Sequence, residues 1–139
     1  MENNTDCLFC KIIRKEIPAN IVYEDNSTIA ILDIHPVNIG HTLVIPKKHI
    51  ENIYIFDEQD TQNVFTAVQK VSKAIKSGIS ADGINLIMNN ERPSGQLVFH
   101  AHVHVIPRHN GDGLAQWKEG RGYKEGEAEE VVGKISSQL

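Results

Sequence analysis

Leu97-Val-Phe-His-Ala-His-Val-His-Val-Ile106 is the stretch of sequence that says most about both fold and function. Apolar residues alternate with histidines, which predicts a β-strand because side chains along a strand point to alternate faces. One face of this strand is expected to be wholly apolar: Leu97, Phe99, Ala101, Val103 and Val105. The other face would present His100, His102 and His104 in a row. A strand backed by a packed core holds such groups rigidly, as chemistry requires.

The segments around this strand predict an α+β fold. Short β-rich runs lie at residues 21–23, 28–32, 42–45 and 84–88. Residues 8–15 carry a short helical stripe, and Pro18 prevents a longer helix there. Asp57 is a good N-cap for a long amphipathic helix that ends at Gly78. Neighbouring strands with one segregated long helix and a short N-terminal helix indicate a mostly antiparallel sheet.

The composition is that of a single globular domain, residues 1–139. Hydrophobic residues make up 40% and charged residues 23%, with a net charge of −4, so a general nucleic-acid-binding surface is not expected. No apolar run approaches the roughly 18 residues of a membrane span, and the polar opening 1–6 does not resemble a secretory signal. We therefore expect no nucleic-acid or membrane partner and a cytoplasmic location.

Three histidines at this spacing point to chemistry rather than to ordinary surface or core positions. A neutral imidazole near pH 7 is a nucleophile and can also donate or accept a proton. His100 and His104 would lie about 13 Å apart along a strand, so one metal ion cannot use all three imidazoles. The loop 89–96 supplies amide groups suited to an anionic phosphoryl group, although carbonyl and phosphoryl substrates both remain possible from the residues alone.

The two cysteines form the motif Cys7-Leu-Phe-Cys10. This spacing allows both thiolates to bind one tetrahedral metal ion, with two further ligands supplied from elsewhere. A redox pair and two inert buried thiols are the alternatives, and the first of these has no thioredoxin-like βαβ context.

The sequence His100-Ala-His102-Val-His104-Val-Ile-Pro107 resembles the signature of the histidine triad (HIT) family. Residues 9–19, 32–34 and 40–50 resemble further blocks of that family, in the same order. Together the recognisable blocks cover about residues 7–113, which leaves 114–139 as a variable C-terminal tail. The resemblance implies a HIT-like fold, a homodimer and a nucleotide-binding hydrolase.

The implied reaction cleaves the α-phosphate bond of purine nucleotide phosphoramidates or dinucleoside polyphosphates and releases a nucleoside monophosphate. By resemblance, His102 is the nucleophile that forms a nucleotidyl-histidine intermediate, His104 contacts the phosphate and leaving group, and His41 is a further active-site histidine. The resemblance also implies nucleotide-binding positions around them: Asp33 at the ribose, Phe9, Ile12, Ile31 and Ile34 at the base, and Asn89 and Gln96 near the phosphate.

The resemblance further implies one structural zinc ion per chain, held by Cys7, Cys10, His49 and His100, which leaves His102 and His104 for catalysis. Three features bear on the leaving-group preference, and they do not agree. Leu97 stands where the mammalian nucleotide phosphoramidases of the family have Ser, and residues 107–113 resemble the dinucleoside polyphosphate hydrolases. The N-terminal block instead resembles the phosphoramidases. A nucleotide-binding regulatory protein with incidental catalysis is the alternative function.

Overall fold

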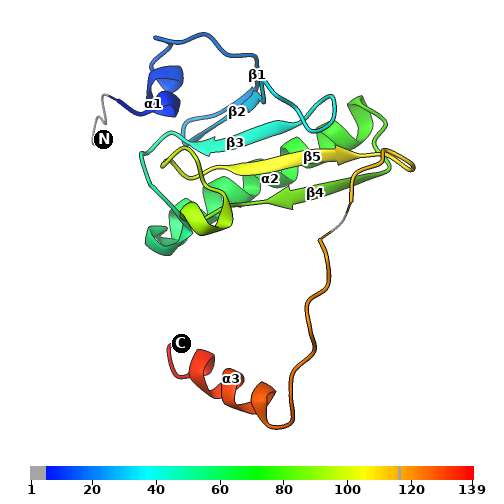
Figure 1. Ribbon diagram of the computed structural model, residues 1–139. Coiled ribbons are helices and arrows are strands. Elements are labelled where there is room, and N and C mark those ends of the chain that lie inside the picture. Colours follow the sequence, from blue (N-terminus) through cyan, green and yellow to red (C-terminus); the bar gives the residue numbers. More distant parts are fainter. Residues whose placement is uncertain (1–5, 116) are drawn as a thin grey trace.

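The computed structural model describes residues 6–115 and 117–139, and within them it confirms the α+β class. The elements follow one another as α1 (Leu8–Ile13), β1 (Ile21–Glu24), β2 (Thr28–Leu32), β3 (Thr42–Pro46), a 3-10 turn (Ile53–Ile55), α2 (Glu58–Gly78), β4 (Gly83–Ile87), a 3-10 turn (Arg92–Ser94), β5 (Val103–Arg108) and α3 (Glu127–Ser136). The five strands form one antiparallel sheet in the order β1-β2-β3-β5-β4 (Figure 1).

The long helix α2 begins and ends where the sequence predicts. The Asp57 carboxylate accepts a hydrogen bond from Asp60 N at 2.7 Å, and the Asp60 carboxylate accepts one from Asp57 N, which forms a capping box. The apolar stripe of α2 packs on one face of the sheet. That core consists of Val64, Ala67, Val68, Val71 and Ile75 from the helix, with Ala30, Val44, Val103 and Val105 from the strands.

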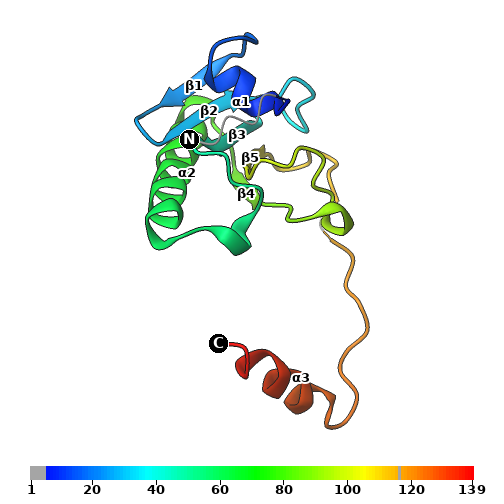
Figure 2. The same ribbon diagram turned by 90° about the vertical axis from the view of Figure 1, so that its left-hand side faces the viewer.

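The opposite face of the sheet carries a second apolar cluster, which includes residues of α1. Strand alternation puts Ile29, Ile31, Leu43 and Ile45 on this face, where they pack with Phe9 and Ile12. His104 of β5 is the register partner of Leu43, so its side chain lies on the same face of the sheet as α1. The sheet therefore separates the α2 core from the face that carries the chemistry (Figure 2).

The predicted strand at 97–106 is wrong in its first half. Strand β5 starts at Val103 and continues to Arg108, and the segment before it is bent. Leu97 is 87% exposed rather than part of the apolar face. A long-range hydrogen bond accompanies the bend: Ala101 N donates to Ile50 O at 2.6 Å, outside the register pairs of β3 and β5. The alternation survives from Ala101 onward, because Ala101, Val103 and Val105 are buried together as expected.

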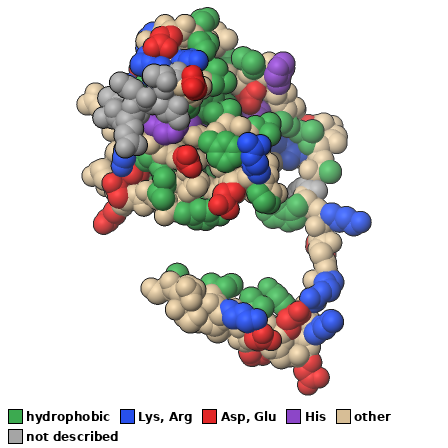
Figure 3. All heavy atoms as spheres, turned by 60° about the vertical axis from the view of Figure 1, so that its left-hand side comes forward, with side chains coloured by type: hydrophobic (Ala, Val, Ile, Leu, Met, Phe, Trp, Pro, Cys, Tyr) green, Lys and Arg blue, Asp and Glu red, His purple; other side chains and the backbone are tan. Residues whose placement is uncertain are grey.

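The C-terminal segment forms an arm that leaves the body and ends in α3 (Figure 1). Helix α3 begins at Glu127 and ends at Ser136. Acidic side chains in the first turn of a helix are favoured by its dipole, and Glu127 also pairs with Arg121 at 2.7 Å. Hydrophobic side chains remain exposed along α3 and beyond it, at Val132, Ile135 and Leu139 (Figure 3). Among the described residues no helix is both long and apolar enough to cross a membrane.

Candidate functional site

The site is built around three imidazoles on the α1 side of the sheet. His41 immediately precedes β3, His104 lies in β5, and His102 lies just before β5. The rings of His102 and His104 have centroids 4.9 Å apart, and those of His41 and His104 are 5.1 Å apart. Pairing of β3 with β5 therefore brings His41 to the residues that the 97–106 motif predicts as reactive.

A backbone carbonyl fixes the tautomer of His102. His102 Nδ1 lies 2.8 Å from His100 O, which can only accept, so the ring proton sits on Nδ1. The other nitrogen, Nε2, then carries an unprotonated lone pair. Phe9 packs edge-on against the ring with centroids 5.1 Å apart and limits its rotation. The result is an oriented, neutral nitrogen nucleophile.

His41 and His104 are linked in a defined proton arrangement. Val37 N donates to His41 Nδ1 at 3.2 Å, so the ring proton of neutral His41 sits on Nε2. That Nε2 lies 2.9 Å from His104 Nδ1 and donates to it. His104 consequently carries its own proton on Nε2, where it can donate to a bound ligand.

All three imidazoles are held in the neutral form near pH 7. Burial is the largest effect and lowers the pKa of His102 and of His41, although the negative charge of Asp33 opposes it for both. Burial, together with repulsion from His102 and His41, lowers the pKa of His104 to about 4. A bound phosphate would counter this shift, because a nearby anion favours the protonated imidazole.

A second cluster consists of Cys7, Cys10, His49 and His100. Cys10 Sγ lies 3.3 Å from His49 Nδ1 and 3.5 Å from His100 Nδ1, and Cys7 Sγ lies 3.4 Å from His100 Nδ1. Ligands of a tetrahedral zinc ion are separated by about 3.3–3.8 Å, given its bond lengths of roughly 2.0–2.3 Å. The four residues named by the resemblance are thus brought together at distances that suit a metal ion.

The chemistry of this donor set also fits a metal. His100 Nε2 donates to Pro46 O at 2.8 Å, so Nδ1 presents its lone pair to the cluster. Burial, with Cys7 as the next contributor, raises the pKa of the Cys10 thiol to about 11. A divalent cation would stabilise both thiolates and remove that penalty.

A third group, Asp33, His41 and His104, also places ligand atoms within reach of one another. Its tautomers do not fit a metal ion. The nitrogen of a metal-bound histidine that faces away from the ion normally donates to a carbonyl or carboxylate. In His41 the corresponding nitrogen, Nδ1, instead accepts from Val37 N, so Nε2 is a donor and not a ligand. This group is suited to proton handling.

The residues expected around the nucleotide base are only partly together. Phe9, Ile12 and Ile31 share the apolar cluster on the α1 side, whereas Ile34 is 82% exposed and lies outside it. Asp33 Oδ1 accepts from His35 N at 2.8 Å, and Asp33 Oδ2 lies 3.7 Å from His41 Nε2, so its carboxylate is adjacent to the histidines. The Asn89 side chain lies beside Gly95, whose φ of +98° turns the 89–96 loop.

Gln96 departs from its expected place near the phosphate. It is 1% exposed, and its amide contacts backbone groups of three segments. Gln96 Nε2 donates to Glu51 O at 2.6 Å and to Val98 O at 3.2 Å, and Gln96 Oε1 accepts from Glu91 N at 2.7 Å. Both amide protons are occupied, so Gln96 holds the loop rather than facing a ligand.

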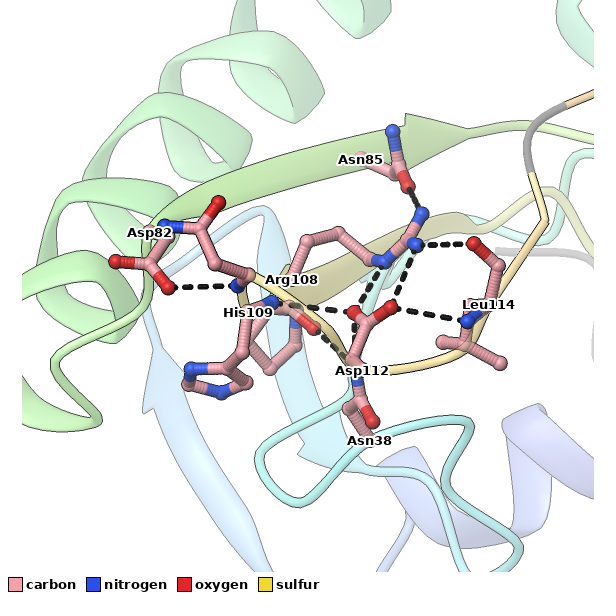
Figure 4. A network of polar contacts seen from close by, with 9 residues as sticks. Asn38, Asp82, Asn85, Arg108, His109, Asp112 and Leu114 are labelled. Carbon is pink, nitrogen blue, oxygen red and sulfur yellow. Dashed lines mark hydrogen bonds and ion pairs between the residues drawn. The ribbon is translucent and has the colours of Figure 1, made fainter.

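The pattern of the sequence did not reveal a polar network at the far end of β5 (Figure 4). Arg108 and Asp112 form a bidentate pair at 2.7 and 2.9 Å, and Asn38 Nδ2 donates to Asp112 Oδ2 at 3.0 Å. The i, i+4 spacing of Arg108 and Asp112 is a signal that could have suggested the ion pair. No local sequence pattern predicts the contact between Asp112 and Asn38.

Fold and site together define a class of protein: a small α+β domain whose antiparallel sheet carries neutral histidines beside a Cys/His cluster. Residues 14–111 match the family model described as the HIT domain. The chain is 44% identical over 137 residues to "Protein hit" of Bacillus subtilis (strain 168), covering 96% of this chain and 94% of that protein. A crystal structure of a HIT family member from Bacillus subtilis superposes with a TM-score of 0.91 at 42% identity, over 96% of this chain and 97% of that one. This chain belongs to the HIT family.

The names of two further relatives mention a bound metal or an enzyme activity. A crystal structure of a "ZN-bound histidine triad family protein" from Mycobacterium smegmatis has a TM-score of 0.77 at 33% identity and covers 97% of this chain and 99% of that one. "Adenylylsulfatase HINT3" of Arabidopsis thaliana is 40% identical over 109 residues, 78% of this chain and 55% of that protein. The family thus includes a zinc-bound member and a member named as an adenylylsulfatase.

Proposed function

We propose that this protein is a nucleotide hydrolase that cleaves the α-phosphate bond of purine nucleotide phosphoramidates or dinucleoside polyphosphates. One observation carries the proposal: His102 Nδ1 donates to His100 O at 2.8 Å, which leaves Nε2 as a neutral nucleophile in the middle of the histidine site. General acid–base groups lie next to it in the His41–His104 pair. The adenylylsulfatase name of an Arabidopsis relative agrees with attack at a nucleotide α-phosphate.

The reaction would proceed in two displacements. In the first, the His102 Nε2 lone pair forms a bond to the α-phosphorus, and the bond from phosphorus to the leaving group breaks. The leaving group departs with that electron pair and takes the Nε2 proton of His104, while His41 Nε2 transfers a proton to His104 Nδ1 within a pair that gained one proton when the anionic substrate bound. In the second, water attacks phosphorus, His104 accepts a proton from the water, and the P–N bond breaks. His102 then regains its neutral form with the proton still on Nδ1.

The remaining residues would bind the nucleotide. Asp33 has a carboxylate oxygen, Oδ2, next to the histidines, where it can accept hydrogen bonds from ribose hydroxyls. Phe9, Ile12 and Ile31 supply apolar surface for a purine base, and Asn89 supplies an amide near the phosphate. Ile34 would contribute as an exposed rim of the base pocket.

We further propose that the Cys/His cluster holds a structural zinc ion. Cys7, Cys10, His49 and His100 would be its four ligands. When bound, zinc would neutralise the two thiolates and connect α1 to the segment before β5, with no open coordination position for substrate. The zinc-bound relative from Mycobacterium smegmatis supports this assignment.

The protein is also proposed to be a homodimer with a single HIT domain and a variable tail. Apolar side chains stay exposed on the outer strand β4, at Leu86 and Ile87, and on α3. A second copy of the chain is the occupant we propose for these surfaces. Light scattering coupled to size exclusion tests it, with a mass of one chain as the contrary result.

The activity is tested by incubating the metal-loaded protein with adenosine phosphoramidate and with diadenosine polyphosphates in parallel and measuring AMP. We expect AMP from at least one substrate class, and the ratio between them gives the leaving-group preference. His102→Ala should lower turnover by about 10³-fold or more while nucleotide affinity, measured by calorimetry, changes little. Nucleotide binding without AMP from any substrate would favour the regulatory binding protein instead.

A further inference from the structure

Side-chain hydrogen bonds join the loop between β2 and β3 to the end of β5 and to the segment that follows it. Asn38 Nδ2 donates to Asp112 Oδ2 at 3.0 Å and to Pro107 O at 2.9 Å. These two bonds join residues about seventy positions apart in sequence. Among the described residues, the Asn38 side chain is linked to residues 107–114 by these two hydrogen bonds.

Asp112 is itself held in place by several donors (Figure 4). Arg108 contributes Nε at 2.7 Å and Nη2 at 2.9 Å, and the backbone N–H groups of His109 and Leu114 donate to the same carboxylate at 3.1 and 3.0 Å. The carboxylate is 8% exposed. A carboxylate so fully hydrogen-bonded has one preferred position, so it is a rigid anchor for Asn38.

The conformation of the 37–41 loop determines which group donates a hydrogen bond to His41 Nδ1. His41 N donates to Asn38 O at 3.0 Å, which closes the turn 38–41, and Val37 N donates to His41 Nδ1 at 3.2 Å. The Val37 N–H can reach the ring only if the loop keeps this conformation. If the loop moved, water or another group would replace that donor, and the two neutral tautomers of His41 would become comparable in energy.

We propose that Asn38 and Asp112 are positioning residues that impose the Nε2–H tautomer on His41 and, through the 2.9 Å contact of His41 Nε2 with His104 Nδ1, the Nε2–H tautomer on His104. The inference rests on the proposed hydrolase function for its meaning, but the tautomer can be measured without any substrate. The wrong tautomer of His41 would place a lone pair against the lone pair of His104 Nδ1 or force His104 to turn its own proton inward.

The primary test measures ring tautomers by long-range ¹H–¹⁵N NMR on protein with ¹⁵N-labelled histidine, with His41 assigned from a His41→Gln spectrum. Wild type should show His41 as the Nε2–H form. In Asn38→Ala, the His41 ring shifts should move toward a mixture of both tautomers. The more conservative substitution Asp112→Asn retains the side-chain shape at position 112 and should shift the His41 ring resonances less, in the same direction. If Asn38→Ala does not fold, Asp112→Asn provides the test of the proposal.

The matched control is Asp82→Asn. The Asp82 carboxylate lies at the same end of the sheet and accepts from Asn110 N at 2.8 Å, and among the described residues no hydrogen bond joins it to Asn38 (Figure 4). This variant should leave the His41 tautomer unchanged. In the activity assay we expect Asn38→Ala to lower kcat about tenfold with KM within about twofold, since only proton handling is impaired.

An unchanged His41 tautomer in folded Asn38→Ala and Asp112→Asn would overturn the proposal. So would an equal tautomer shift in Asp82→Asn, because the effect would then be general loosening of that end of the sheet. If wild type released no AMP while the tautomer shift occurred as described, the hydrolase function would fail and the positioning role would stand.

Discussion

Gln96→Leu separates a supporting role of this side chain from direct contact with a nucleotide. Leucine has a similar volume but no polar atoms, so the substitution deletes three hydrogen bonds, to Glu51 O, Val98 O and Glu91 N. Each backbone group that loses its partner costs about 1–3 kcal/mol, and the flanking residues Glu51 and Glu91 are exposed enough for water to recover part of it. We expect the free energy of unfolding to fall by about 4 kcal/mol.

The assay is urea unfolding at pH 7.5, followed by circular dichroism. A loss of this size corresponds to a fall in melting temperature of roughly 15 °C for a domain of this length. Gln59→Leu is the matched control, because the Gln59 amide lies exposed on α2 and reaches only Asn63 Oδ1 at 2.9 Å. Its stability should stay within about 0.5 kcal/mol of wild type.

The reasoning would be refuted by a Gln96→Leu protein that unfolds within about 1 kcal/mol of wild type. If that stable protein also bound nucleotide much more weakly, the amide would have to contact the nucleotide directly. Measuring AMP affinity on the same preparation therefore completes the test.

Three further predictions follow from the cluster, the histidines and the loop. Cys10→Ser should abolish the roughly one zinc per chain expected by elemental analysis of wild type and lower the melting temperature, whereas retained stoichiometric zinc would argue against the ligand set. Because burial lowers the folded-state pKa of His104 to about 4 from about 6.5, the unfolded chain binds more protons in that range. Stability should therefore fall as the pH drops from about 6.5 toward 4, by about 1 kcal/mol per pH unit from this group, and His104→Gln should flatten the slope in urea titrations. Gly40→Ala should cost about 1–3 kcal/mol, since Gly40 has φ +97° and a Cβ there would lie 3.2 Å from Ile79 Cγ1. Gly133→Ala on the arm, with nothing within 4 Å, should leave the melting temperature of the body unchanged.

Local patterns in the sequence predicted the regular elements well. Strand β2 matches the predicted run residue for residue, and α2 starts after Asp57 because the capping box is a local signal. The reactive face was also accessible from sequence, since strand alternation puts His102 and His104 on one side. These features depend on neighbours within a few positions, so periodicity and capping rules suffice.

Features set by distant partners could not be predicted. The chain bends before Val103, where Ala101 N bonds Ile50 O, and no local pattern distinguishes that bend from a continuing strand. The direction of the Gln96 amide depends likewise on Glu51 and Val98. The link of Asn38 to Asp112 spans 74 positions and arises only once β2, β3 and β5 have paired.

The spacing of the Cys/His cluster along the chain also has a consequence during synthesis on the ribosome. Cys7 and Cys10 are synthesised before His100, which follows Cys7 by 93 positions. At a translation rate of about 5–20 residues per second, roughly 5–19 s pass between the synthesis of the two cysteines and that of His100. During this interval they are neighbours on an incomplete chain, without the packing that later surrounds them. The order of translation thus exposes the two cysteines to oxidation before the histidine that completes the cluster has been synthesised.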